Sequence, residues 1–220
     1  ILLFITLTVS CSNEKPTFNK FSDIKLLKGK QLEIDQDVLM SSNRILLIDT
    51  ILVVLENKRD KFLCLFDIHS GKLICEGGTK GRGPGELITP WTLFESNLDN
   101  SFIVFDATAR RSNYFFIDSL IINPNFKPSI RINLNIEYGM LSYPLFISDS
   151  ILVSPGIFSD GRLIFFDTQG NFIKKTGEIP NKKLHRNAPD EIIQQAYQSV
   201  MSIDPNKEKI AILTRYSDRL

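Results

Sequence analysis

The sequence predicts an all-β protein of the β-propeller class, built from four-stranded antiparallel blades. Three observations support this fold. The chain of 220 residues is 43% hydrophobic and contains 16 Phe, a composition that favours strands around a substantial core. Short apolar runs alternate with turn residues along most of its length. Groups of four such runs recur about every fifty residues, which is the spacing that propeller blades produce.

The N-terminal residues are typical of an export signal. Residues 1–10 are apolar and uncharged, Cys11 follows, and residues 12–16 are polar. A run of this length cannot span a bilayer, which needs about 20 apolar residues. Residues 7–11, Leu-Thr-Val-Ser-Cys, resemble the bacterial lipobox, which implies that residues 1–11 are a signal peptide and that Cys11 is lipidated. A plain signal peptide and a buried apolar strand are the alternatives.

The chain that follows has two parts. Residues 12–43 are expected to form an N-terminal linker, in which residues 24–34 could be the strand that closes the last blade of a ring. Residues 44–220 are expected to form a partial propeller. Because no Met and no basic segment precede Ile1, we expect the reading frame to begin upstream.

The predicted strands fall into three whole blades and half of a fourth, separated by turn residues. The first blade comprises residues 44–48, 51–56, 61–67 and 72–76. The second comprises residues 91–95, 101–106, 112–118 and 129–134. The third comprises residues 143–148, 150–154, 162–167 and 171–176, and the fourth begins with residues 198–203 and 209–214. Residues 189–197 have helical spacing and are placed in a loop insertion before the fourth blade.

An Asp recurs at the end of the third predicted strand of each blade. Asp67, Asp118 and Asp167 each follow an apolar run, and they lie 51 and 49 residues apart. A β-sandwich, the main alternative fold, gives no reason for such a repeat. The identical position in each blade favours hydrogen bonds within turns over a metal-binding or acid–base role.

Two further cysteines lie in the first blade. If residues 68–71 form a hairpin loop, Asp67 faces Lys72 and Cys64 falls opposite Cys75, so a cross-strand disulfide is geometrically conceivable. The alternative is two free cysteines that act as small buried hydrophobic residues. Because no CxxC motif or nearby histidine pair accompanies them, we expect no metal site.

One glycine-rich segment resembles a known family. Residues 77–87, Gly-Gly-Thr-Lys-Gly-Arg-Gly-Pro-Gly-Glu-Leu, and the later Pro90 are similar to the GxxGxGPGEF-x-x-P signature of NHL-type and TolB-like six-bladed propellers. The resemblance covers residues 77–118. The segment lacks the motifs of a phosphate-binding loop and leads into a strand, so its glycines are expected to permit a tight crossover between blades.

The resemblance implies a six-bladed disc with a central channel, a form that usually serves as a binding platform. Several relatives are lipoproteins of Gram-negative bacteria, which implies lipid anchoring in the cell envelope, at the outer membrane, on its periplasmic or surface face. Six blades of about fifty residues need ~300 residues. An open ring would leave an unpaired edge, so we expect C-terminal blades outside this sequence.

The longer connections are predicted to lie on one face, called the long-loop face below. Connections between second and third strands and between blades all return to this face, and functional residues concentrate on such loops. It presents eight basic or histidine side chains: Lys58, Arg59, Lys80, Arg82, Arg110, Arg111, His185 and Arg186. They could hold an acidic or phosphorylated ligand. The alternative is a solvated rim balanced by Asp60, Glu86 and Asp106.

The functional expectation is a non-catalytic scaffold that binds a protein, peptide or glycan through the long-loop face. The formal net charge is only +1, which disfavours nucleic acid as a partner. The chain contains two histidines, His69 and His185, and no GxSxG or HExxH motif, so we expect no catalytic residues, metal or cofactor. The alternative is an envelope hydrolase or lyase whose catalytic residues lie largely outside this sequence.

Overall fold

The computed structural model describes residues 26, 28–29, 31–34, 38–136, 139–158, 161–179, 189–204 and 206–215. The chain divides into two units, residues 1–31 and 32–220, and every assigned strand and helix lies in the second. No helix in the described ranges is long and apolar enough to cross a membrane. The described residues within the predicted closing strand, 24–34, are not in a strand, and Cys11 lies outside the described residues.

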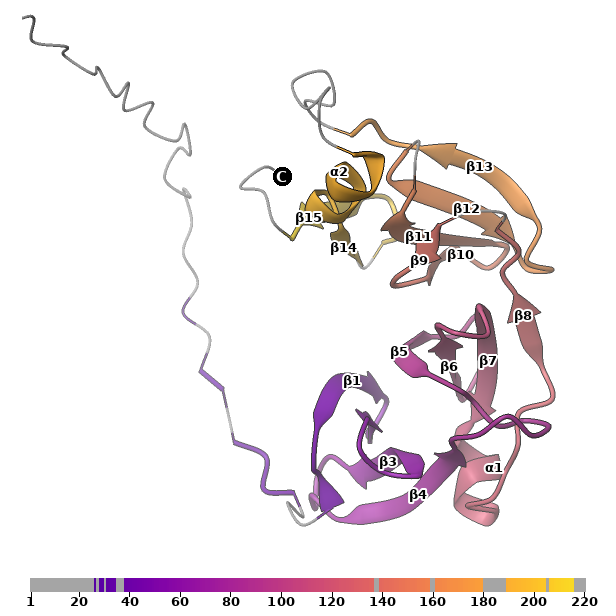
Figure 1. Cartoon of the computed structure of the whole chain (residues 1–220). Helices are drawn as coiled ribbons and strands as arrows, with labels where there is room; N and C mark the ends of the chain where they lie inside the picture. The colour runs from indigo at the N-terminus through magenta and orange to yellow at the C-terminus, as the bar shows by residue number, and fades with distance from the viewer. Residues whose placement is uncertain are drawn as a thin grey trace, which may run out of the picture. The chain divides into compact units, whose positions relative to one another are not determined.

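The second unit consists of successive antiparallel sheets, each formed by neighbouring strands of the sequence (Figure 1). Blade 1 contains β1 (Ser42–Ile48), β2 (Ile51–Glu56), β3 (Lys61–Asp67) and β4 (Leu73–Thr79). Blade 2 contains β5 (Pro90–Glu95), β6 (Ser101–Asp106), β7 (Arg111–Phe116) and β8 (Arg131–Asn133). Blade 3 contains β10 (Leu145–Ser148), β11 (Ile151–Ile157), β12 (Leu163–Asp167) and β13 (Phe172–Thr176), with β9 (Met140–Leu141) paired to β11. Blade 4 contains β14 (Ser199–Ile203) and β15 (Ile210–Thr214).

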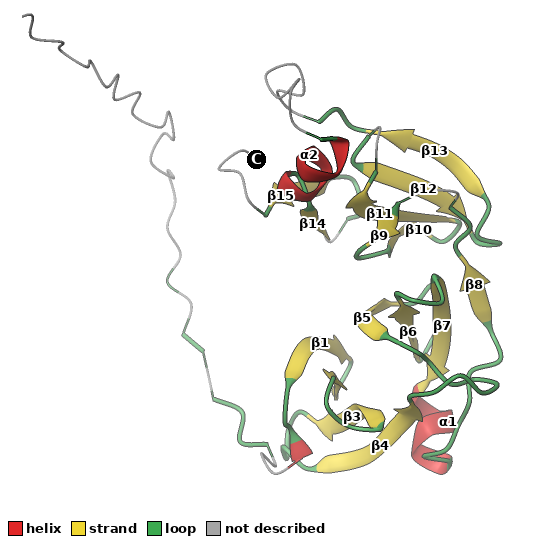
Figure 2. Ribbon diagram, in the orientation of Figure 1, coloured by secondary structure: helices red, strands yellow, loops and turns green. Residues whose placement is uncertain are grey.

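Strands account for most of the assigned structure (Figure 2). The prediction of an all-β chain with four-stranded antiparallel blades is therefore confirmed, and the strand bounds agree with the sequence-based ones to within a few residues. The helix predicted at residues 189–197 is also confirmed, as α2 (Asp190–Ala196).

The core lies between consecutive blades. One apolar cluster joins blades 1 and 2, and in it Phe115 stacks on Phe102 with ring centroids 5.8 Å apart and meets Phe62 edge-on at 6.0 Å. A second cluster joins blades 2 and 3 around Phe105 and Phe166. All five phenylalanines are fully buried. Since burying one such side chain contributes about 1.5–3 kcal/mol, packing between blades stabilises this unit substantially.

A short helix replaces the predicted end of one strand. The strand expected at residues 112–118 ends at Phe116, and α1 (Ile117–Ile122) follows it, so the prediction that Asp118 ends a strand is wrong. Ile117 and Leu120 lie three residues apart and are both buried, in the cluster between blades 1 and 2. Helical spacing brings these two side chains onto one face, and their burial in that cluster explains the helix.

The predicted alignment of Cys64 with Cys75 is wrong by one residue. A β-bulge between β3 and β4 shifts the register between Leu65 and Phe66, so Cys75 pairs with Leu65 and Cys64 with Glu76. Directly paired residues share a face and neighbours alternate, which places the two sulfurs on opposite faces of the sheet. Both cysteines are free and buried, as the alternative interpretation expected.

Hairpin turns on the side opposite the long-loop face are built as the sequence predicted. Asp67 accepts hydrogen bonds from the backbone N–H and hydroxyl of Ser70, each at 2.7 Å. Asp167 accepts them from the backbone N–H groups of Gln169 and Asn171 at 2.9 and 2.8 Å. The turn role assigned to these two aspartates is confirmed, and these local bonds lower the pKa of both carboxyls.

Candidate functional site

Backbone hydrogen bonds tie the loops of the long-loop face to neighbouring segments in blades 1 and 2. The backbone N–H of Lys80, at the end of blade 1, donates to the carbonyl of Asp60 at 3.1 Å. The N–H of Leu134 donates in the same way to the carbonyl of Arg110 at 2.8 Å. Loops within each blade therefore bond to the segment that leaves the blade.

Several basic side chains of this face hold loops in place. Arg59 forms an ion pair with Glu76 and donates to the carbonyl of Val38 at 2.9 Å. Lys80 donates to the carbonyl of Asn57. These contacts lie within one blade and its approach, so they stabilise the fold and do not define a ligand site.

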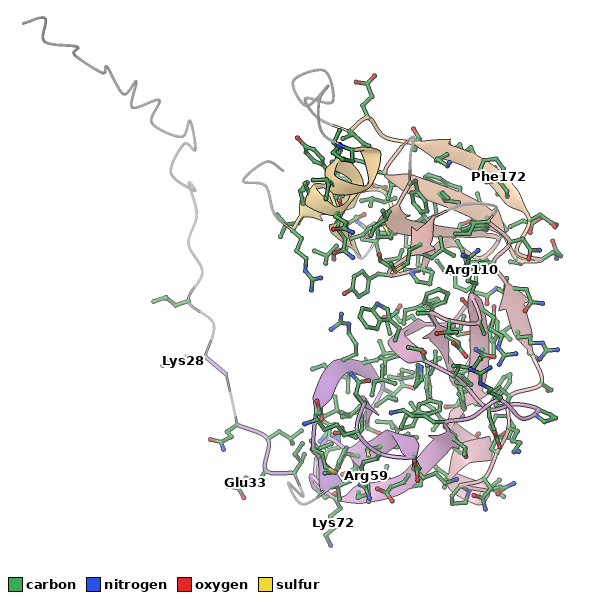
Figure 3. The ribbon with its side chains drawn as sticks, in the orientation of Figure 1. Lys28, Glu33, Arg59, Lys72, Arg110 and Phe172 are labelled. Carbon is green, nitrogen blue, oxygen red and sulfur yellow. The ribbon has the colours of Figure 1, made fainter. Side chains whose placement is uncertain are left out.

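The two arginines of blade 2 also hold loops in place. Arg110, in a left-handed backbone conformation with φ of 52°, donates to the carbonyl of Ile136 at 3.1 Å. Arg111 donates to the carbonyl of Glu86 at 2.9 Å and lies 3.9 Å from the carboxylate of Asp106. Arg59 and Arg110 come from different blades (Figure 3), so the predicted basic cluster is distributed along the face.

The remaining predicted residues fall into two groups. Lys58 and Arg82 are exposed. His185 and Arg186 lie outside the described residues. The predicted set therefore divides into four side chains that hold loops, two that face solvent and two without a described position.

Buried carboxylates, which sequence reasoning did not single out as structural, fix the long-loop face. Glu56 is 0% exposed and accepts hydrogen bonds from the N–H groups of Met40, Ser41 and Lys58 at 2.8–3.1 Å. Burial pushes its pKa up, but these bonds together with the Ser42 hydroxyl outweigh burial, and its pKa is lowered. The charged form of Glu56 thus anchors the segment that leads into blade 1.

Asp106 does the same for blade 2. It is 0% exposed and accepts from the N–H groups of Ile88, Thr89 and Ala109 at 2.8–3.2 Å. Its assignment to a solvated rim was therefore wrong. In blade 3 the equivalent position is Gly156, where the approaching segment pairs directly as β9. The fifty-residue spacing of Glu56 and Asp106, each at the end of an apolar run, was the signal in the sequence.

The first strands of the blades line a shared space. β1 contacts β5, and β5 contacts β10. Each of these strands begins on the long-loop side, because the connections between blades lie there. Two pockets of the space can therefore be assigned to its two ends: one near the beginnings of these strands, called the long-loop pocket, and one near their ends, called the short-loop pocket.

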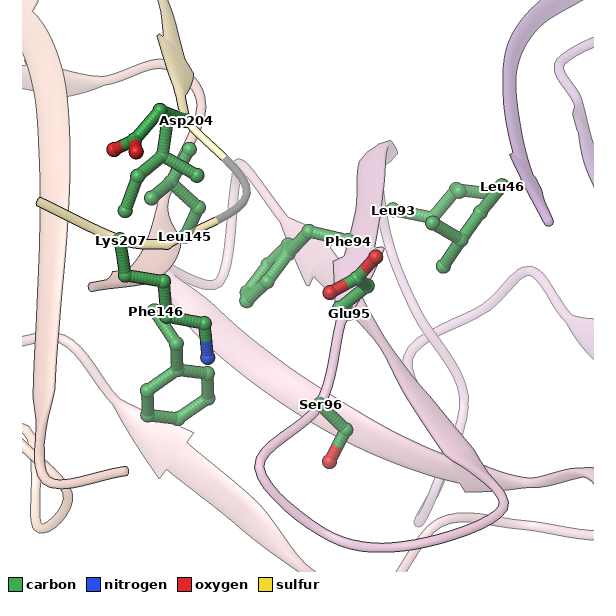
Figure 4. Close-up of a pocket in the computed structure, with 10 residues that line it drawn as sticks. Leu46, Leu93, Phe94, Glu95, Ser96, Leu145, Phe146, Asp204 and Lys207 are labelled. Atoms are coloured by element: carbon green, nitrogen blue, oxygen red, sulfur yellow. The ribbon is translucent and has the colours of Figure 1, made fainter. Parts of the chain in front are cut away.

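The short-loop pocket has a volume of about 530 Å³ and mixed walls (Figure 4). Glu95 and Ser96 follow from the end of β5, whereas Asp204 and Lys207 come from the turn between β14 and β15. Apolar side chains, among them Leu46 and Phe146, complete the wall. Charges of both signs line this pocket.

The long-loop pocket has a volume of about 510 Å³. Its lining comes from all four blades: Arg44, Thr92, Leu93, Phe94, Tyr143, Pro144, Leu145, Val200, Met201 and Arg215. Arginine is the only charged residue type among them, and it occurs at two positions. A volume of this size and a mainly apolar wall with few polar groups are typical of small-ligand sites.

Aromatic side chains position one of the two arginines. Arg44 donates to the Tyr143 hydroxyl at 2.8 Å, and its guanidinium carbon lies 4.9 Å from the centre of the Tyr143 ring. The Trp91 ring lies 6.5 Å from the Tyr143 ring at 35° and is 38% exposed. Arg215 donates to the Gln198 side chain at 3.4 Å. The pocket thus combines two guanidinium groups with the Tyr143 ring, and Trp91, which is not part of the lining, packs beside that ring.

Sequence reasoning missed this pocket. Arg44 and Tyr143 of its lining and the adjacent Trp91 all stand at the beginning of the first predicted strand of a blade. That shared position was the available signal. Among the described residues, no group of three or more His, Cys, Asp or Glu side chains could hold a metal ion.

Comparison with known proteins identifies the fold independently. The sequence profile of the family described as TolB-like 6-blade propeller-like matches residues 19–220, which confirms the resemblance seen in residues 77–87. No curated protein sequence matches the chain.

Solved structures of low sequence identity share the fold. A presumed exported protein of Bacteroides fragilis is 20% identical, with a TM-score of 0.51 over 69% of this chain and 40% of that one. A member of the DUF4221 family from Bacteroides vulgatus is 11% identical, with a TM-score of 0.52 over 89% of this chain and 64% of that one. A Lactobacillus plantarum protein is 13% identical, with a TM-score of 0.51 over 80% of this chain and 49% of that one. The chain therefore spans less than two thirds of the length of each.

Proposed function

Because the chain belongs to the TolB-like 6-blade propeller-like family, we propose that it is a non-catalytic scaffold that binds a protein, peptide or glycan through the long-loop face. The observation that carries the proposal is the long-loop pocket. It combines Arg44 and Arg215 with an apolar wall on the side where the connections between blades converge. Rigid strands position these groups, and such positioning lowers the cost of binding.

The centre of the face is a better candidate than its periphery. Arg59, Lys80, Arg110 and Arg111 are engaged in bonds to backbone carbonyls or carboxylates of the fold. Moving them toward a ligand would break those bonds, and a buried carbonyl left without a donor is costly. We therefore assign a supporting role to these four peripheral cations, and we assign binding to the pocket because of its volume and its mainly apolar wall.

The proposal predicts which variants abolish binding. In a screen of glycan and peptide arrays with the whole protein, Arg44→Ala and Arg215→Ala should remove the signals of specific binders. Arg82→Ala, an exposed arginine of the same face, and Lys207→Ala, in the short-loop pocket, are the matched controls and should leave those signals unchanged. Loss of binding in Lys207→Ala alone, or arrays without any specific binder, would contradict the proposal.

We further propose that the protein is exported and held in the cell envelope of a Gram-negative bacterium by a lipid on Cys11. The apolar residues 1–10 and the lipobox-like residues 7–11 support this location. Metabolic labelling with a fatty-acid probe should mark the whole protein and not Cys11→Ala, while Cys75→Ala should be labelled like the unmodified chain. Equal labelling of Cys11→Ala would reject the anchor.

A further inference from the structure

We propose that the long-loop pocket takes the free C-terminal carboxylate of a peptide that ends in a large apolar residue. This inference rests on the proposed function and names the ligand class of the same site. It follows from the charge of the pocket, from its apolar wall and from its position at the loop side of the blades.

The charge of the pocket selects an anion. The described residues that line it include Arg44 and Arg215 and no acidic side chain. Elsewhere in this nearly neutral chain the charges are mixed: the short-loop pocket, for example, combines Glu95 and Asp204 with Lys207. Arginine binds carboxylates through two parallel hydrogen bonds. The hydrogen bond from Arg44 to Tyr143 fixes where that guanidinium stands.

The apolar wall selects what carries the anion. Six of the ten lining residues are apolar: Leu93, Phe94, Pro144, Leu145, Val200 and Met201. Thr92 and Tyr143 are the uncharged polar side chains of the lining. A sugar needs hydrogen-bond partners for several hydroxyl groups, and a dianionic phosphate group needs more polar partners than this mainly apolar wall offers. A carboxylate beside a large apolar side chain matches both the arginines and the apolar residues of the lining.

The aromatic side chains of the pocket, Phe94 and Tyr143, favour a ring in the terminal residue, and Trp91 packs on Tyr143 from beside the lining. Trp91 is 38% exposed although its neighbours in β5 on both sides are buried. Its ring and the Tyr143 ring are tilted by 35° with centroids 6.5 Å apart. Aromatic rings prefer tilted or offset partners at this separation, so a terminal Phe, Tyr or Trp can pack against the Phe94 and Tyr143 rings that line the pocket.

The position of the pocket favours the C-terminus of a peptide over a small carboxylic acid as the ligand. The pocket lies where the first strands begin, on the side of the loops that connect the blades. A peptide held by its last residue can continue across the long-loop face, where Lys58 and Arg82 are exposed. A free aromatic acid would use the pocket alone and gain nothing from the face.

The test compares peptides that differ only at the C-terminus, using the whole protein. The probes are a short fluorescent peptide ending in Phe with a free carboxylate, the same peptide with a C-terminal amide, and the same peptide ending in Ser. Fluorescence anisotropy should show that amidation weakens binding at least about tenfold, since hydrogen bonds to a charged group are lost. Replacement of Phe by Ser should weaken it by a similar factor. N-acetyl-phenylalanine, the free-acid arm, should bind more weakly than the peptide.

Protein variants locate the effect. Arg44→Ala and Arg215→Ala should each weaken the free-acid peptide at least about tenfold and abolish its preference over the amide. Arg44→Lys keeps the positive charge but cannot form two parallel hydrogen bonds, so it should lose less affinity for the free-acid peptide than Arg44→Ala. Arg82→Ala is the matched control and should preserve the preference. Because Arg44 packs on Tyr143, thermal unfolding of each variant verifies the fold, and Arg215→Ala provides an independent test.

The outcomes separate this inference from the function on which it rests. Acid and amide peptides that bind equally, or N-acetyl-phenylalanine that binds as tightly as the peptide, overturn the C-terminus inference. If those peptides or the array ligands still lose affinity in Arg44→Ala and Arg215→Ala, the proposed function stands. If binding persists in both variants and is lost in Lys207→Ala, both proposals fail.

Discussion

Four acidic side chains at strand ends differ in how far along the chain their partners lie. Asp67 and Asp167 bond to groups two to four residues away, so turn chemistry read from the sequence predicted their role. Glu56 bonds to N–H groups 15 and 16 residues earlier, and Asp106 to groups 17 and 18 residues earlier. These long-range contacts form only after the blade has folded, so turn chemistry could not predict them, and the fifty-residue spacing of the two acids was their only signal.

Neutralising Glu56 tests whether its charge holds the segment that leads into blade 1. We expect Glu56→Gln to lower the free energy of unfolding by about 1.5–3 kcal/mol at pH 7, since bonds to a buried charged group are weakened. Its folded-state pKa is lowered, so the stabilisation is present above the unfolded pKa and is lost as the pH falls through the folded one. Urea denaturation should therefore show the difference between the two proteins shrinking below about pH 4.5.

The control for this experiment is Glu178→Gln, at an exposed glutamate. Its unfolding free energy should stay within about 0.5 kcal/mol of the unmodified chain. A difference between Glu56→Gln and the unmodified chain that grows toward acid pH would contradict the anchor role.

Gly170 offers a second test at the residue scale. Its φ is +83°, and a Cβ there would overlap the carbonyl oxygen of Asn133 in β8 of the preceding blade. We expect Gly170→Ala to destabilise the protein by about 2–4 kcal/mol, from the left-handed conformation and the displaced β8 together. Gly29→Ala, where a Cβ meets nothing within 4 Å, should leave the urea midpoint unchanged. Equal midpoints for the two variants would mean that blade 3 does not approach β8 so closely.

At the scale of elements, the strands were predictable and their irregularities were not. Apolar runs bounded by turn residues marked both edges of β2, β3 and β6. In contrast, α1 has the sequence Ile-Asp-Ser-Leu-Ile-Ile, and so short an apolar run cannot be distinguished from a strand by periodicity. The bulge at Ile74 of β4 shifts the register by one residue. No single residue type marks it, because it depends on how β4 packs against its neighbours.

The bulge predicts the behaviour of the cysteines. Burial and then the nearby Glu76 raise the pKa of Cys64 to about 11, and burial raises the pKa of Cys75. A protonated, buried thiol reacts slowly, so both should react with a thiol reagent only after denaturation. The intact mass should not change on treatment with reductant. A gain of two hydrogens on reduction, or two fast-reacting thiols in the native protein, would contradict the register described for β3 and β4.

At the scale of the whole molecule, the repeat predicted the blades but not the pocket. Each blade is a local unit of the sequence, whereas Arg44 and Tyr143 are 99 residues apart and meet only when blades 1 and 3 share one space.

The arrangement of the whole molecule also bears on the predicted closing strand at residues 24–34. A Cβ at Gly71 would overlap the carbonyl of Glu33, just as one at Gly170 would overlap that of Asn133 in β8. Glu33 thus lies against Gly71 of blade 1 as Asn133 of blade 2 lies against Gly170 of blade 3, and closure of the last blade by residues 24–34 stays a prediction.

The central claim is that ligand binds in the long-loop pocket, and hydroxyl-radical footprinting of the whole protein tests it most directly. With a ligand from the arrays or the Phe-ending peptide bound, oxidation of Trp91, Tyr143 and Met201 should fall. Phe172, which is 56% exposed on β13, should be oxidised as before (Figure 3). Unchanged oxidation of Trp91, Tyr143 and Met201 at saturating ligand, with protection elsewhere, would contradict the account.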